Sequence, residues 1–209
     1  MQYFVKTPWW LKKIYPRRLW KMNTKDKIVY LTFDDGPHPL ATPFVLDQLK
    51  RYQAKATFFC IGKNVVEYPS IYQRILQEGH RTGNHTYTHP NGWKKSPGIY
   101  LEDIKEATKY IRSKLFRPPY GRISQSQAKG INEAIGDRSA KIVMWDVLSG
   151  DFDESLIKEK CLENVIKNSS AGSIVVFHDS EKAFPRLEYV LPRVLEFFSG
   201  KGYAFGSLE

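Results

Sequence analysis

The chain has 209 residues, of which 42% are hydrophobic and 14% aromatic, a composition typical of a globular domain rather than of a disordered or fibrous protein. Its net charge of +10 favours anionic partners in general and does not by itself distinguish nucleic acid, anionic lipid or acidic glycan. The basic residues are dispersed and no nucleic-acid recognition module is present, so we expect no nucleic-acid partner.

The first 24 residues form an aromatic and basic segment, called here the N-terminal arm, which precedes a single domain formed by residues 25–209. We expect the arm to pack on that domain, because exposing its large aromatic side chains is costly: Trp9, Trp10, Tyr15 and Trp20. The alternative is contact of residues 1–22 with an anionic membrane, which aromatic and basic residues would suit. No run is long enough to span a membrane and no secretion signal is visible, which leaves the cytoplasm and the cell envelope open.

From residue 27 onward, short apolar runs alternate with amphipathic stretches, a pattern that predicts βα units and a parallel sheet. Strands are predicted at 28–33, 56–61, 81–84, 115–117, 141–147, 173–177 and 202–205. Helices are predicted at 42–52, 70–79, 100–115, 124–136, 155–168 and 185–199, with Ser155 and Pro185 at helix starts. The fold class is therefore α/β. A distorted (β/α) barrel of about seven strands fits this length best, and a doubly wound open sheet is the alternative.

The first predicted strand ends in Thr32-Phe33-Asp34-Asp35-Gly36-Pro37. Neighbouring side chains on a strand need not face the same way, so one of the two carboxylates can bind a metal ion while the other moves a proton. For this segment alone, a simple strand-end turn is the alternative interpretation.

Two histidines lie four residues apart in His85-Thr86-Tyr87-Thr88-His89-Pro90. This spacing lets both imidazoles bind one ion, although an isolated pair of this kind is usually structural or exposed. A carboxylate from another strand end would complete a set that leaves one position open for water, as in catalytic zinc sites.

Two further segments supply an arginine and a histidine. Arg117-Pro118-Pro119-Tyr120-Gly121 is held extended by its prolines; its arginine either pairs with a carboxylate in a cleft or is a surface residue of a rigid connector. The fixed backbone there can also offer an amide donor for an oxyanion. His178 follows the apolar strand at 173–177, where it is either a core histidine or a general acid.

These four motifs, in this order, resemble those of the polysaccharide deacetylases with a NodB-homology domain, carbohydrate esterase family 4, from about residue 27 to the C-terminus. The resemblance implies a distorted (β/α) barrel that removes N-acetyl groups from GlcNAc-type residues of peptidoglycan or a chitin-like glycan. It also implies that a divalent metal, most often zinc, with cobalt, nickel or manganese as alternatives, is bound by Asp35, His85 and His89.

The same resemblance assigns the proton transfers. Asp34 would be the general base, oriented by Arg117, and His178 would be the general acid. The backbone amide of Tyr120 would join the metal in binding the oxyanion.

The resemblance is incomplete at Trp145-Asp146-Val147-Leu148. Many members carry an aspartate near the position of Leu148 that tunes the acid histidine. We expect Asp146 or Asp151 to approach His178 instead.

We expect substrate to contact Tyr120, Trp145 and Asp146. The two aromatic rings can stack on a sugar, although each can equally belong to the core. The rival hypothesis for the whole chain is a catalytically silent glycan-binding or membrane-peripheral protein on the same barrel.

Overall fold

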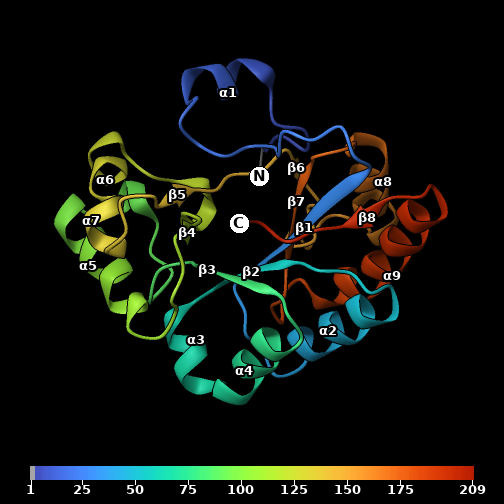
Figure 1. Ribbon diagram of the computed structural model, residues 1–209, viewed down its shortest axis with the longest axis horizontal. Helices are drawn as coiled ribbons and strands as arrows, with labels where there is room; N and C mark the ends of the chain where they lie inside the picture. The colour runs from blue at the N-terminus through green and yellow to red at the C-terminus, as the bar shows by residue number, and fades with distance from the viewer. Residues whose placement is uncertain (1–2) are drawn as a thin grey trace.

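The structure, a computed structural model, describes residues 3–209 and contains eight strands within that range. The strands follow the order β5-β4-β3-β2-β1-β7-β6, with β8 paired to β1, and every pair is parallel. Their bounds are β1 Ile28–Asp34, β2 Thr57–Cys60, β3 Arg81–Asn84, β4 Leu115–Phe116, β5 Lys141–Ile142, β6 Val147–Leu148, β7 Ile174–His178 and β8 Ala204–Phe205. This curled parallel sheet, ringed by helices in Figure 1, confirms the predicted distorted (β/α) barrel.

The central strand β1 is buried on both faces, as its apolar sequence requires. Val29, Leu31 and Phe33 pack in the main core together with the apolar faces of α2 and α9. The alternate residues point to the inside of the barrel, where Tyr30 packs in a smaller cluster and Thr32 and Asp34 follow it toward the carboxyl end. The strand thus carries an apolar outer face and an inner face that becomes polar at the site.

The prediction of one continuous strand at 141–147 is wrong. The chain pairs with β4 only as far as Ile142 and joins β7 at Val147, so the residues between them cross from one edge of the sheet to the other. The arm lies along both edges: Leu19 exchanges hydrogen bonds with the carbonyl of Ile142 (2.9 Å) and the amide of Met144 (2.8 Å). Because edge strands otherwise expose unpaired backbone groups, the arm completes the barrel at this gap.

The helices of the described residues are α1 Trp9–Ile14, α2 Ala41–Arg51, α3 Gly62–Glu67, α4 Pro69–Gln77, α5 Pro97–Thr108, α6 Gln125–Lys129, α7 Ile131–Ile135, α8 Lys158–Asn168 and α9 Phe184–Gly200, with short 3₁₀ turns at Gly92–Lys94 and Pro119–Gly121. The predicted helix at 124–136 is divided at Gly130, and α5 ends before 115. Ser155 does not start a helix, because its amide and hydroxyl both bond Asp153 in a turn. None of these helices is long and apolar enough to cross a membrane.

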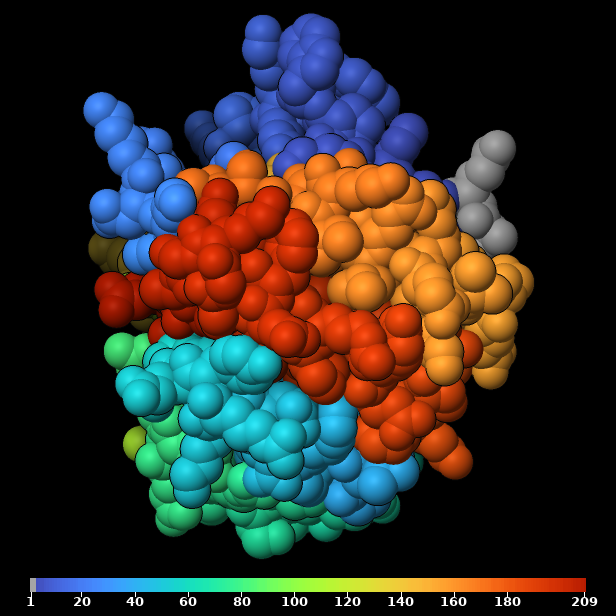
Figure 2. Space-filling model, turned by 90° about the vertical axis from the view of Figure 1, so that its right-hand side faces the viewer, coloured from blue at the N-terminus to red at the C-terminus, as the bar shows by residue number. Residues whose placement is uncertain are grey.

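The arm packs on the barrel only in part. Trp20 is buried, as expected, and its indole donates to the carbonyl of Tyr15 (3.0 Å). Trp9 and Trp10, however, are 69% and 44% exposed, so the expectation that these rings are covered is wrong. The reason is that α1 leaves the barrel between the two paired stretches of the arm, and Figure 2 shows the arm projecting above the rest of the molecule.

Asp146 holds the arm in place. Its buried carboxylate accepts hydrogen bonds from Lys6 (2.6 Å), Lys12 (2.5 Å) and the hydroxyl of Ser173 (2.6 Å). Ser173 precedes β7 and His178 ends it, so about 16 Å of strand separates Asp146 from the site described below. The expectation that Asp146 binds substrate or approaches His178 is therefore corrected: this carboxylate lies at the amino end of the barrel.

Asp146→Asn is expected to lower the free energy of unfolding by about 2 kcal/mol, because it removes the charge that two partly exposed lysines share. Burial opposes ionisation, but the bonds from Lys12 and Lys6 outweigh it and lower the pKa of Asp146. The stabilisation is therefore present above about pH 4 and is lost as the pH falls below it. Urea unfolding at pH 7 and pH 3 measures both effects. Lys13→Gln, which changes a lysine outside this cluster, should leave stability nearly unchanged; an equal loss there would contradict the role of Asp146.

Candidate active site

The two acids at the end of β1 point in different directions. Asp34 is paired in register with His178 of the neighbouring strand β7, and its buried side chain bonds Arg117 inside the barrel (Oδ1 to Nη1, 2.6 Å). Asp35 has a positive φ of 82°, which turns its side chain out of the strand's alternation. Adjacent carboxylates are thereby given separate surroundings, as the sequence pattern allows.

Arg117 is fully buried, and its guanidinium bonds protein oxygens on several sides. Besides Asp34, it donates to the hydroxyl of Thr32 (2.7 Å) and to the carbonyl of Met144 (3.0 Å). Its plane lies over the ring of Phe59, 4.1 Å from the centroid. The guanidinium therefore fixes Asp34 in one orientation, and the alternative of a surface arginine is wrong.

Asp35, His85 and His89 converge on one point. Their ligand atoms all lie within 4.8 Å of one another, with Asp35 Oδ1 3.6 Å from His85 Nε2 and 3.2 Å from His89 Nε2. Asp35 Oδ1 is buried and has no hydrogen-bond partner among the described residues. An orphaned carboxylate oxygen facing two imidazole nitrogens is the donor set of a divalent metal site.

The protonation of His85 also suits a metal ligand. Its Nδ1 lies 2.7 Å from the carbonyl of Arg117, which can only accept, so Nδ1 carries the hydrogen and Nε2 presents its lone pair to the cluster. Burial lowers the pKa of His85 to about 4, which keeps the ring neutral near pH 7. These observations fit a metal ion whose ligands include the neutral imidazole of His85.

The loops that carry the site are held in unusual backbone conformations. Within residues 3–209, five non-glycine residues have a positive φ, and four of them lie in this site: Asp35, Thr86, His89 and Tyr120. Such conformations cost of the order of 1–3 kcal/mol each and persist only where neighbouring contacts enforce them.

Asp103 of α5 enforces the loop between the two histidines. Its carboxylate accepts the amides of Tyr87 (2.7 Å) and Thr88 (3.0 Å) and the hydroxyl of Thr88 (2.6 Å). The sequence offered no signal for this role, because an acid on an amphipathic helix is usually a solvated surface residue.

His178 is paired with Asp151. The imidazole Nδ1 of His178 lies 2.8 Å from Asp151 Oδ1, and the backbone amide of His178 donates to Asp151 Oδ2 at 2.8 Å. This confirms that one of the two candidate acids approaches this histidine. Burial alone would lower the pKa of His178, but the charge of Asp151 and the hydrogen bond to it outweigh burial and raise it to about 9. The ring is therefore protonated at neutral pH.

The segment that carries Asp151 also contacts the arm. The ring of Phe152 lies 5.2 Å from the His178 ring and 5.2 Å from the ring of Tyr3, while the Tyr3 hydroxyl donates to Asp153 (3.1 Å). The arm thus reaches the loop that positions this histidine.

A third acid, Asp179, supports the turn after Asp35. Its fully buried carboxylate accepts the amide of Gly36 (3.1 Å) and the hydroxyl of Thr42 (2.5 Å). A Cβ at Gly36 would lie 2.1 Å from Asp179 Oδ2, so only glycine fits there. Burial raises the pKa of Asp179 to about 8. The sequence placed Asp179 in a motif without indicating this supporting role.

Tyr120 and Trp145 flank the cluster. The Tyr120 side chain is 62% exposed, and its ring centroid lies 4.7 Å from that of His89. The half-buried Trp145 packs against the backbone of Gly121. The Tyr120 ring thus lies beside one proposed metal ligand and Trp145 lies beside the turn that follows Tyr120, whereas Asp146 lies at the amino end of the barrel.

Comparison with known proteins agrees with this arrangement. The sequence matches the family described as polysaccharide deacetylase over residues 21–135, slightly more than half of the chain. The chain belongs to the polysaccharide deacetylase family.

Relatives of this deacetylase act on glycans, according to their names. A peptidoglycan-N-acetylglucosamine deacetylase of Bacillus cereus is 34% identical over 89% of this chain and 88% of its own length. A chitooligosaccharide deacetylase of Azorhizobium caulinodans is 37% identical over 76% of this chain and 77% of its own length. The chain spans only 38% of the longer peptidoglycan-N-acetylglucosamine deacetylase PgdA of Listeria monocytogenes, at 34% identity over 88% of this chain.

The fold is shared with a solved member of the family. The crystal structure of a peptidoglycan N-acetylglucosamine deacetylase in complex with 4-naphthalen-1-yl-N-oxidanyl-benzamide superposes with a TM-score of 0.86 and 32% identity, covering 97% of this chain and 95% of the other.

Asp151→Asn is expected to lower the pKa of His178 from about 9, because burial remains while the charge that raises this pKa most is lost. NMR titration of the imidazole resonances in the metal-free deacetylase measures this, with His178→Gln assigning the signal. Asp153→Asn changes a nearby acid that bonds Tyr3 instead and should leave the pKa of His178 unchanged. A titration that stays near 9 in Asp151→Asn would refute the pairing.

Asp103→Ala is expected to weaken metal binding by about 10- to 100-fold, as loss of outer support for a metal ligand typically does. Competition with a chromogenic chelator gives the affinity. The matched control is Glu102→Ala, which removes an exposed acid from the preceding position of the same helix. Equal affinities of the Asp103 variant and the unmodified protein would show that the loop holds its shape without this carboxylate.

Proposed function

We propose that this deacetylase is a metal-dependent hydrolase that removes N-acetyl groups from GlcNAc-type residues of a peptidoglycan or chitin-like glycan. The observation that carries the proposal is the convergence of Asp35, His85 and His89 at the strand ends that also carry the register pair Asp34 and His178. The names of the relatives from Bacillus cereus and Azorhizobium caulinodans support this class of substrate.

The metal ligands are proposed to be Asp35, His85 and His89. Two imidazoles and one carboxylate suit Zn²⁺, with cobalt, nickel or manganese as substitutes. A divalent ion in this place supplies a Lewis acid that polarises the amide carbonyl and lowers the pKa of water toward about 7.

Asp34 is proposed as the general base. Arg117 holds its Oδ1 at 2.6 Å and compensates its charge, so the carboxylate stays fixed in one orientation. It accepts one proton from the attacking water, whose oxygen forms the new bond to the acetyl carbon.

His178 is proposed as the general acid. Asp151 holds Nδ1, which leaves the Nε2 proton for the substrate, and the raised pKa keeps that proton in place near pH 7. When the bond between carbon and nitrogen breaks, His178 protonates the departing amine, and acetate and a free amino sugar result.

Two further residues are proposed to contact the reacting group and the sugar. The backbone amide of Tyr120 donates to the carbonyl oxygen as negative charge develops on it, and the exposed Tyr120 ring and Trp145 provide stacking surfaces for a pyranose. No observation favours the catalytically silent alternative, since each proposed role has a candidate residue at the site: Asp34, His178 and the cluster of Asp35, His85 and His89.

The proposal predicts chelator-sensitive acetate release that depends on Asp34. Acetate is measured from an acetylated chitooligosaccharide, with bound metal quantified on the same samples. Chelator should abolish release and Zn²⁺ should restore it, while Asp34→Asn should retain the metal and lower kcat by about 10²- to 10⁴-fold.

The control is Asp47→Asn, an exposed acid that pairs with Arg74, which should behave as the unmodified protein. Full activity in Asp34→Asn would exclude this residue as the base. Full activity in protein shown to be metal-free would exclude the metal-dependent reaction.

A further inference from the structure

The surface of the arm concentrates exposed apolar side chains. Of the thirteen exposed large hydrophobic side chains among the described residues, five lie within residues 4–15. They are Phe4 (59%), Trp9 (69%), Trp10 (44%), Ile14 (59%) and Tyr15 (40%). No residue of α1 is buried. Exposed apolar side chains that are grouped in this way are typical of an interaction surface.

The same segment is purely cationic. Residues 1–25 contain seven lysines and arginines and no acid, since the first acidic residue is Asp26. Lys6 and Lys12 bond Asp146, which leaves other arm cations beside the rings: Lys13 lies 4.8 Å from the centroid of Trp9, and Arg18 lies 4.0 Å from that of Tyr15. The surface therefore combines aromatic side chains with positive charge.

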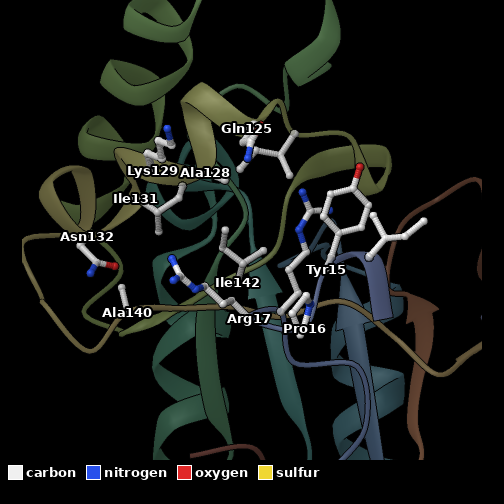
Figure 3. A pocket seen from close by; sticks show the side chains of 13 residues that line it. Tyr15, Pro16, Arg17, Gln125, Ala128, Lys129, Ile131, Asn132, Ala140 and Ile142 are labelled. Carbon is white, nitrogen blue, oxygen red and sulfur yellow. The ribbon is translucent and has the colours of Figure 1, made fainter. Parts of the chain in front are cut away.

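A groove extends this surface onto the barrel. It has a volume of about 940 Å³ and lies between the arm and helices α6 and α7. Figure 3 shows Ile131 and Ile142 on its barrel side, with Arg17 and Lys129 at its border. The described residues that line it include no acid, so its charge has the same sign as that of the arm.

The helix α1 is attached at the end of the barrel away from the active site, whereas Tyr3, before the start of this surface, reaches the loop beside His178. Lys12 of α1 is bonded to Asp146, which is bonded in turn to Ser173 before the start of β7. His178 lies at the carboxyl end of that strand. A large partner on α1 would thus lie at the other end of β7 from His178.

We propose that the arm surface, formed by residues 4–18, binds a membrane that contains anionic lipids. Tryptophan and tyrosine prefer the headgroup region of a bilayer, and each lysine or arginine near an anionic leaflet adds about 1 kcal/mol. A second copy of the chain would bring two surfaces of the same charge together. A soluble polyanion would gain nothing from five exposed apolar side chains. The binding is interfacial, with α1 lying in the headgroup region rather than crossing it.

The test is sedimentation of the full chain with vesicles of phosphatidylcholine alone or mixed with phosphatidylglycerol. We expect binding to the mixed vesicles only, weakened by salt. Trp9→Ala with Trp10→Ala should lower the partition coefficient at least tenfold, and Arg17→Gln with Arg18→Gln should lower it about 25-fold, since 1 kcal/mol corresponds to about fivefold for each charge.

Two control variants match these changes in chemistry but not in position. Trp93→Ala removes another exposed tryptophan, and Lys94→Gln with Lys95→Gln removes two exposed cations elsewhere; both should keep most of the vesicle binding. Acetate release from a soluble chitooligosaccharide by the Trp9 and Trp10 variant should equal that of the unmodified protein, which verifies its fold.

Three results would overturn the proposal. The first is absence of binding to the mixed vesicles. The second is equal loss in the arginine variant and the Lys94 and Lys95 variant, which would indicate attraction by net charge alone. The third is a change of occupant. Vesicle binding that survives loss of both tryptophans would indicate a polyanion site. Self-association that is lost with both tryptophans, in protein that does not bind vesicles, would indicate a second copy of the chain.

Discussion

The buried guanidinium of Arg117 is the interaction on which both halves of the active site depend. A fully buried charge is tolerable only with an opposite charge and a complete set of acceptors, which Asp34, Thr32 and the carbonyls of residues 143 and 144 supply. At the same time the backbone carbonyl of Arg117 fixes the ring of His85. One residue therefore positions the proposed base through its side chain and a proposed metal ligand through its main chain. Any shift of the segment that follows β4 displaces both.

Around this centre, three acids outside the reacting set each stabilise one loop. Asp103 accepts from the loop between the two histidines, Asp179 from the turn after Asp35, and Asp151 from both the ring and the amide of His178. Carboxylates suit this task because they accept several hydrogen bonds at once. They also offset the conformational cost of the positive-φ residues at the site. The geometry of the proposed metal ligands is thus set by residues that bond the loops carrying them.

The sequence predicted those parts of the site that lie at strand ends, because parallel strands bring their carboxyl ends together whatever the loops do. It did not distinguish Asp146 from Asp151, since that choice depends on the turn at Gly150, whose φ of 83° returns the chain toward β7. Asp103 gave no signal, because only the tertiary structure places its helix beside the histidine loop. The division of the strand at 141–147 was hidden for a similar reason: its apolar pattern continues, but its partner changes from β4 to β7.

The helix α1 is exposed because the backbone on either side of it is hydrogen-bonded to the barrel. Residues 5–7 pair with residues 146–148. Residues 19–22 pair with residues 142–144 and 172–173, so both flanks of α1 are fixed to the barrel. The helix between them cannot collapse onto the core without breaking those bonds and the buried Asp146 cluster. Tyr3 contacts the His178 loop at one end of the barrel and Lys12 contacts Asp146 at the other. Because both contacts belong to one continuous segment, the exposed aromatic surface keeps a fixed orientation relative to the candidate active site.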